Sequence, residues 1–145
     1  MGAMTTRAVA RGAGRGALGA MVMSAVRTVT TGFGLVEQTP PDAVFREGAP
    51  RVMAQVPPER RQAVVELMHW VYGLVGGALY AALPDRLRRP SWSGPVYGLL
   101  LWLTFEIGWA PVLGLARQHH RRPVERLVLA ADHTLYGWVL SPPRR

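Results

Sequence analysis

Four apolar stretches of about twenty residues each most constrain what this chain can fold into. A helix of around 20 apolar residues crosses a bilayer core about 30 Å thick. Such stretches lie at about 16–36, 63–83, 95–115 and 124–140, of which the last is the shortest and most polar. They predict an all-α, polytopic membrane protein with four transmembrane helices, arranged as two hairpins in a single membrane domain covering residues 1–145.

The charge distribution is typical of membrane spans flanked by cations. All 17 basic residues are arginine, and the formal net charge is +8. Nearly all of them lie between the apolar stretches, as expected of loops at a membrane surface. A nucleic-acid-binding domain would gather them on one helix face or interleave them with aromatic residues, so we expect no nucleic-acid partner. The absence of cysteine excludes disulfides, thiolate chemistry and cysteine-ligated metals.

The first stretch has one rival interpretation, a cleaved signal peptide. Arg7, Arg11 and Arg15 would then form its positively charged start. However, the apolar run continues past Ala25 to Val36, and no small-residue cleavage site closes it. A membrane span is therefore the favoured interpretation.

Residues 37–62 connect the first two stretches and contain two proline pairs, Pro40-Pro41 and Pro57-Pro58. One or two short amphipathic turns are expected between the pairs, lying on the membrane surface. Proline is tolerated in the first turn of a helix, so the second pair indicates a helix start. We therefore predict a proline-rich interfacial linker between the first and second helices.

Small residues recur at four-residue spacing in every stretch. Such a column lies on one helix face, and glycine in it allows two helix backbones to approach closely. The predicted helix-packing positions are Gly16, Gly73, Gly77, Gly98 and Gly137. The full columns are Gly12-Gly16-Ala20-Ser24, His69-Gly73-Gly77-Ala81, Gly94-Gly98-Trp102-Glu106-Ala110 and His133-Gly137-Ser141.

Each stretch also carries ionisable residues on or beside its small-residue face. An unpaired charge is costly inside a bilayer, so these groups should face the bundle interior and pair with one another. Arg27 is the only fixed cation among them, and we expect it to bond Glu106 or Asp132. The predicted intramembrane polar cluster consists of Arg27, Glu66, His69, Glu106, Asp132 and His133.

Two short segments indicate an internal repeat. The sequence HWVYG at residues 69–73 resembles HTLYG at residues 133–137. If the second and fourth helices run in the same direction, the repeat relates the two hairpins by an axis along the membrane normal. A duplication and a chance match both remain open.

The arginine count does not decide the orientation in the membrane. With four spans, both termini share a side with the loop at residues 84–94, and each side carries eight arginines. The compact N-terminal group favours cytoplasmic termini. The expected location is the cell membrane, as a multi-pass protein.

Three apolar segments between residues 60 and 140 carry a family resemblance. They are a helix from His69 to Pro84, a tryptophan-led helix from Trp92 to Leu115 that ends in PVLGL, and a helix with a central His133. Together they resemble the YagU-like family of small inner-membrane proteins. The resemblance implies a multi-span protein with a loose link to acid tolerance. The family has no agreed catalytic residues, so it implies none here.

Three functions stay open at this point. The first is an accessory or structural membrane protein, in which the polar cluster fixes helix packing. The second is transport of protons or a small ion through the glutamate, aspartate and histidine residues of that cluster, since histidine titrates near neutral pH. The third is binding of a b-type haem between His69 and His133.

Other chemistry has little support in the sequence. No nucleophile–base pair stands out, so we predict no enzymatic activity, no catalytic residue and no metal site. The expected partners are the lipid bilayer and either a second copy of the chain or a larger membrane complex.

Overall fold

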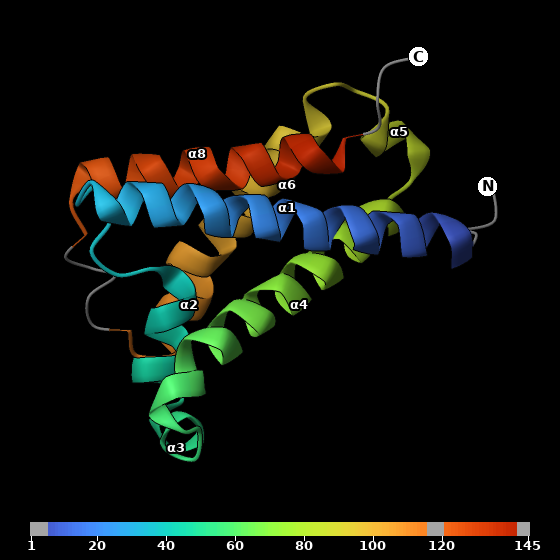
Figure 1. Cartoon of the computed structure of the whole chain (residues 1–145). Coiled ribbons are helices and arrows are strands. Elements are labelled where there is room, and N and C mark those ends of the chain that lie inside the picture. The colour runs from blue at the N-terminus through green and yellow to red at the C-terminus, as the bar shows by residue number, and fades with distance from the viewer. Residues whose placement is uncertain (1–5, 116–120, 142–145) are drawn as a thin grey trace.

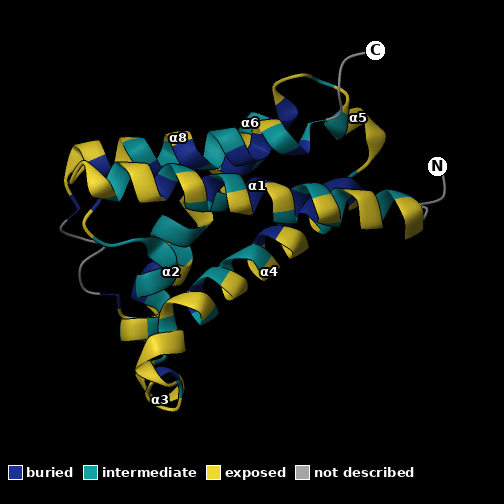
Figure 2. Cartoon of the chain, viewed as in Figure 1, coloured by how far each residue is buried: buried dark blue, intermediate teal, exposed yellow. Residues whose placement is uncertain are grey.

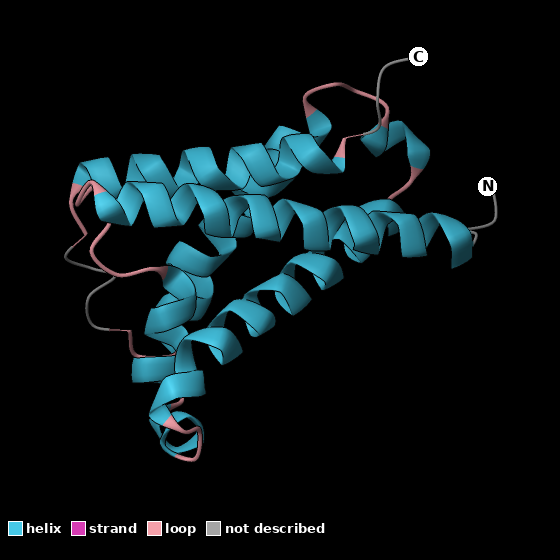
Figure 3. Cartoon of the chain, in the orientation of Figure 1, coloured by secondary structure: helices cyan, strands magenta, loops and turns pink. Residues whose placement is uncertain are grey.

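Helices make up the described chain, which confirms the all-α prediction. The computed structural model describes residues 6–115 and 121–141, and this part of the chain contains no strand (Figures 1 and 3). The long segments are α1 (Thr6–Gly32), α4 (Arg61–Ala82), a rod of α6 (Ser93–Thr104), η3 (Phe105–Trp109) and α7 (Ala110–Val112), and α8 (Pro123–Leu140). The short segments are α2 (Pro40–Ala43), η1 (Val44–Gly48), α3 (Pro50–Ala54), η2 (Pro58–Arg60) and α5 (Asp85–Arg88).

The helix boundaries follow the predicted stretches, with one clear difference. Helix α1 begins at Thr6 rather than near residue 16, so Arg7, Arg11 and Arg15 lie on the helix and not in an arm before it. Arginine is a good helix former because its straight stem loses little freedom in a helix. Among the described residues, one segment, Pro58–Ala82, is long and apolar enough by length and composition to cross a membrane.

The four long segments alternate in direction. Helix α1 packs most extensively on α4, and α6 packs on α8, while α1 also contacts α8. The start of α1, helix α5 and the end of α8 lie at one end of the molecule, and α2 lies near the other (Figure 1). Helix α4 diverges from α1 toward its own N-terminal end, where the short helices of the linker lie.

Helices α1 and α4 meet backbone to backbone along their small-residue faces. A Cβ atom added to Gly77 would lie 2.7 Å from the Cα of Gly16, and one added to Gly73 would lie 2.5 Å from the Cβ of Ala20. Carbon atoms in favourable contact are about 3.5–4.0 Å apart. These positions therefore admit only glycine at the present helix separation.

Helices α6 and α8 meet in the same way. A Cβ atom on Gly98 would lie 3.1 Å from the backbone nitrogen of Gly137, and one on Gly137 would lie 2.6 Å from the carbonyl carbon of Gly94. The five glycines predicted as packing positions thus lie at the two closest helix contacts. The equivalent placement of Gly73 and Gly137 matches the repeat seen in the sequence.

Tyrosine hydroxyl groups tie the two helix pairs together. The Tyr136 hydroxyl donates to the Gly73 carbonyl at 2.6 Å, and the Tyr97 hydroxyl donates to the Gly76 carbonyl at 2.8 Å. The Tyr136 ring lies where side chains on Gly19 and Gly76 would otherwise be. A buried tyrosine needs a partner for its hydroxyl group, and here Gly73 and Gly76 of α4 supply their backbone carbonyls.

The rod from Ser93 to Val112 contains one π-helical turn, η3. The Ala110 amide donates to the carbonyl of Phe105, five residues earlier. Pro111 follows directly, and proline both lacks an amide donor and crowds the carbonyl four residues before it. The wider turn accommodates Pro111 without ending the helix.

The linker folds against the bundle. The predicted short turns are present as α2, η1 and α3. Ala43 in α2 is fully buried and forms a small apolar cluster with Ala110 and Leu115. The α2 and η1 part of the linker therefore packs against the bundle, whereas α3 is mostly exposed (Figure 2).

The close helix contact predicts a sharp difference between two glycines of α1. Gly16→Ala places a methyl group against the backbone of α4, whereas Gly14→Ala meets no atom within 4 Å. We expect Gly16→Ala to lower the free energy of unfolding by about 1–3 kcal/mol. Gly14→Ala should leave it unchanged or raise it by up to about 1 kcal/mol, since alanine favours helix.

Both variants can be compared by unfolding in mixed micelles of increasing sodium dodecyl sulfate content, followed by circular dichroism. Equal unfolding midpoints for the two variants would contradict the backbone contact between α1 and α4.

Candidate functional site

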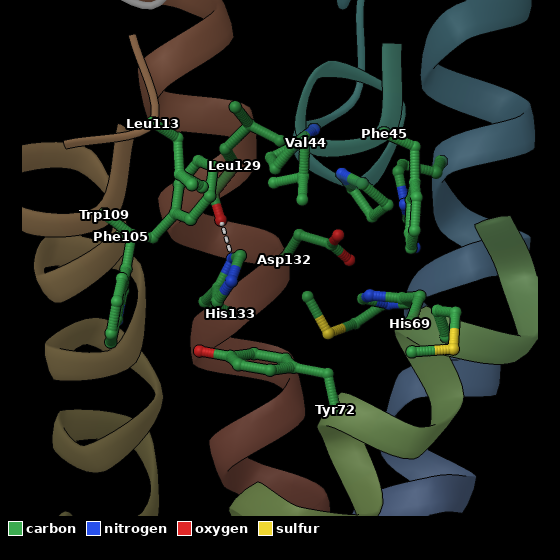
Figure 4. A pocket seen from close by; sticks show the side chains of 15 residues that line it. Val44, Phe45, His69, Tyr72, Phe105, Trp109, Leu113, Leu129, Asp132 and His133 are labelled. Carbon is green, nitrogen blue, oxygen red and sulfur yellow. Dashed lines mark hydrogen bonds between the residues drawn. The ribbon is translucent and has the colours of Figure 1, made fainter. Parts of the chain in front are cut away.

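A cavity of about 300 Å³ lies where the linker meets the helix bundle. Its walls come from α1, α2, η1, α4, η3 and α8, and from Leu113, which follows α7. The lining is mostly apolar. Figure 4 shows the aromatic and aliphatic side chains around it, together with the side chains of His69, Asp132 and His133. The apolar part of the lining includes Met23, Phe45, Met68, Tyr72, Phe105, Trp109 and Leu129.

Four of the six residues of the predicted polar cluster line this cavity: Arg27, His69, Asp132 and His133. Arg27 and Asp132 are buried, at 6% and 4% exposure. The His69 Nε2 atom and the Asp132 Oδ1 atom are buried without a hydrogen-bond partner. The cavity thus brings together a cation, a carboxyl group and two imidazoles, with hydrogen-bonding capacity left unused.

The backbone of α8 fixes the state of the His133 ring. The Nδ1 atom lies 2.8 Å from the Leu129 carbonyl oxygen, which can only accept, so Nδ1 carries the hydrogen (Figure 4). In a neutral ring the Nε2 atom is then an acceptor. Asp132 and His133 therefore add two acceptors to the wall formed by α8.

Glu66 lies beside the cavity and is bound by its own set of partners. The Ser24 hydroxyl donates to Glu66 Oε2 at 2.5 Å, and Gln62 donates to Oε1 at 3.3 Å. The same Ser24 oxygen accepts from Trp70 Nε1 at 3.2 Å and from Arg27 Nη2 at 3.3 Å. Ser24 therefore connects Arg27 and Glu66 at the contact of α1 with α4.

The ion pair expected from Arg27 to Glu106 or Asp132 is not found. Within the described residues, no ion pair involves Arg27. Glu106 instead pairs with Arg126 of α8, with 3.3 Å between Oε1 and Nε. The physical reason for the position of Glu106 is the π-helical turn. Glu106 lies in η3, where the wider turn changes the rotation per residue, so that residues four apart no longer lie on the same face as in α6.

A second polar cluster lies at the start of α8, and the sequence did not single it out. Glu125 is buried and pairs with Arg122 at 2.9 Å, while Arg122 also donates to the Gly34 carbonyl at 2.9 Å. Arg121 is buried and donates to the Gln38 carbonyl at 3.1 Å. These bonds fasten the end of α1 and the linker to α8.

Arg121 lies two residues before the start of α8. Burial lowers the pKa of its guanidinium group, and the carboxylates of Glu106 and Glu125 oppose that effect. The adjacent His119 and His120 lie outside the described residues. The spacing of Arg122 and Glu125, three apart at a helix start, was the available signal for this cluster.

The geometry gives little support to haem between His69 and His133. The Asp132 carboxyl group projects into the space between these two side chains (Figure 4), and a haem plane would have to displace it. Among the described residues, no group of three histidine, aspartate or glutamate side chains is placed to hold a metal ion.

Comparisons of the chain with protein-family models, with curated proteins and with solved structures find no match. The YagU-like resemblance therefore stays a prediction.

The role of Ser24 can be tested by Ser24→Ala. The change removes one hydroxyl group and leaves Glu66, Trp70 and Arg27 each short of a partner, so the free energy of unfolding should fall by about 1–2 kcal/mol. Ser91→Ala, at an exposed loop position, is the matched control and should change nothing measurable. If both variants unfold at the same detergent fraction as the parent chain, Ser24 does not hold the helix pair.

Proposed function

We propose that this chain is a small multi-pass membrane protein of accessory or structural type, with four membrane-spanning helices and cytoplasmic termini in the cell membrane. Its partners are the bilayer and a further membrane component, either a second copy or a larger complex. The observation that carries the proposal is the placement of large and small apolar residues, which is the reverse of that in a soluble helical bundle.

Large apolar side chains lie outside the bundle. Leu67, Leu74 and Leu79 of α4 are 55%, 41% and 57% exposed, and Leu100 and Ile107 of the rod are 54% and 69% exposed. The interior of the same helices consists largely of glycine, alanine and tyrosine. A soluble protein rarely exposes a contiguous apolar surface of this kind, whereas lipid favours it and small residues mediate helix contact there.

Helix lengths and aromatic positions agree with membrane crossing. At a rise of 1.5 Å per residue, the 22 residues of α4 extend about 33 Å and the 18 residues of α8 about 27 Å, close to the hydrocarbon thickness. Trp92 before α6 and Trp138 near the end of α8 are both exposed. Tryptophan prefers the boundary between lipid and water, so this end of the bundle would lie at one membrane surface.

The accessory role rests on how the polar groups are used. Glu66 is bound to Ser24 of α1, and Glu106 is bound to Arg126 of α8, so each bond joins two helices. Such bonds help to fix which helix faces meet, because a partly buried charged group has few favourable partner positions. The exposed apolar faces of α4 and the rod then remain available to lipid or to a partner helix.

The chain offers a direct topology test because it contains no cysteine. Single cysteines can be placed at Glu59 in η2, at Ser91 before α6 and at Leu100 on the outer face of α6. In intact cells, a membrane-impermeant maleimide should label Glu59→Cys but not Ser91→Cys, and inside-out vesicles should show the reverse. Leu100→Cys should stay unlabelled in both until detergent dissolves the membrane.

The cysteine-free parent is the control for background labelling. Recovery of the chain in the soluble fraction, or equal labelling of all three variants from one side, would contradict the four-span proposal.

Proton or small-ion transport is the second candidate, and the unpartnered atoms of His69 and Asp132 in one cavity favour it. Against it, no hydrogen bond among the described residues joins any two of Glu66, His69, Glu106, Asp132 and His133. The accessory proposal predicts that liposomes containing the protein show no proton flux above those containing Glu106→Gln, under either a pH gradient or a voltage. Flux that Glu106→Gln abolishes would favour transport instead.

A further inference from the structure

The cavity between the linker and the bundle is a built site rather than a packing defect. A cavity lined by apolar groups alone would contain no polar atom without a hydrogen-bond partner. Here the buried Asp132 side chain has one carboxyl oxygen without a partner, and His69 has an unpartnered ring nitrogen in the same wall region. Buried polar groups normally have partners, so these two atoms point to a ligand that supplies the missing bonds.

The size of the cavity limits the ligand to a small molecule. A volume of about 300 Å³ is at the lower end of small-molecule sites and corresponds to roughly ten water-sized groups. That is enough for one ring with a short substituent. A complete lipid with two acyl chains would extend beyond the cavity.

The apolar lining favours a flat ring. Tyr72 of α4 and Phe105 and Trp109 of η3 line the cavity with aromatic rings, and Met23 and Met68 line it with flexible thioether side chains. Aromatic rings pack favourably with one another in tilted or offset geometry, and methionine sulfur also contacts ring edges well.

The polar part of the lining favours a neutral hydroxyl group. One arginine and one carboxyl side chain line the cavity, and their formal charges cancel, so an anionic ligand gains no net attraction. The free oxygen of an ionised Asp132 and the Nε2 atom of a neutral His133 accept from a ligand hydroxyl group, while Arg27 has donor hydrogens that Ser24 does not use. A hydroxyl group can donate to the carboxyl oxygen and accept from the guanidinium group at the same time.

We propose that the cavity binds a neutral aromatic alcohol of the phenol or quinol type, with its ring against Phe105 and Trp109 and its hydroxyl group on Asp132. This goes beyond the accessory role. The proposal rests on the proposed membrane location in one respect only, that the bilayer is the source of the lipid-soluble ligand. Binding to the purified chain can therefore be measured whatever the topology.

The test is calorimetric titration of the full chain in detergent micelles with 4-butylphenol and with n-butylbenzene, which differs by the hydroxyl group alone. We expect saturable binding of one 4-butylphenol per chain, about tenfold tighter than n-butylbenzene, the change expected from one hydrogen bond to a charged group. Empty micelles give the background from partitioning.

Two variants separate the polar and apolar parts of the site. Asp132→Asn should weaken 4-butylphenol about tenfold and leave n-butylbenzene within twofold of the parent. Val44→Phe, which fills the cavity from η1, should weaken both probes. Glu59→Gln and Leu100→Phe make the same chemical changes at exposed positions and should bind both probes as the parent does.

Three results would overturn the proposal. The first is the absence of saturable binding above micelle partitioning. The second is equal affinity for the two probes, or no effect of Asp132→Asn and Val44→Phe. The third is tighter binding of laurate than of 4-butylphenol, which would assign the cavity to an anionic amphiphile. Each is distinct from a failed topology test, because none depends on the sidedness of labelling.

Discussion

The contact of two glycine-bearing backbones is the interaction on which the rest of this structure depends. In α1 and α4, and again in α6 and α8, the helices approach until no side chain fits between them at Gly16, Gly77, Gly98 and Gly137. Dispersion contacts are individually small but numerous when backbones touch over several turns. Because these helix contacts leave little room for side chains, many of the large apolar residues lie on the outer surface, among them Leu67, Leu79 and Ile107.

A bundle packed in this way needs a different source of specificity from a soluble core. Interlocking leucine and phenylalanine side chains fix the register of soluble helices. Here hydrogen bonds fix the helix register instead: Tyr136 and Tyr97 donate to carbonyls of α4, and Ser24 donates to Glu66. The Tyr136 bond is buried and the other two are partly buried, so a shift of one helix by a turn would leave these groups without their partners.

The sequence predicted the parts of this arrangement that depend on helix periodicity alone. The four-residue columns placed Gly16, Gly73, Gly98 and Gly137 on faces that do meet, because α1, α4, α6 and α8 are regular helices at those positions. The column of α6 failed at Glu106, since the π-helical turn before Pro111 changes the rotation per residue and turns Glu106 toward Arg126.

The cavity was beyond prediction because it depends on the linker. Its polar wall came from residues that the sequence had grouped, namely Arg27, His69, Asp132 and His133. Its apolar wall includes Val44 and Phe45, which belong to a segment without a regular pattern. Only long-range folding of η1 onto the bundle encloses the space, and local sequence carries no signal for such a contact.

The two matching segments, HWVYG and HTLYG, differ in what their tyrosines contact. Tyr136 fits against Gly76, which lies three residues after Gly73, but the corresponding position in α8, three residues after Gly137, is Leu140. Tyr72, the counterpart of Tyr136, therefore has no glycine to receive its ring and remains at the cavity, half exposed. Tyr136 therefore fills space between α4 and α8, whereas Tyr72 forms part of the wall of the cavity beside η1.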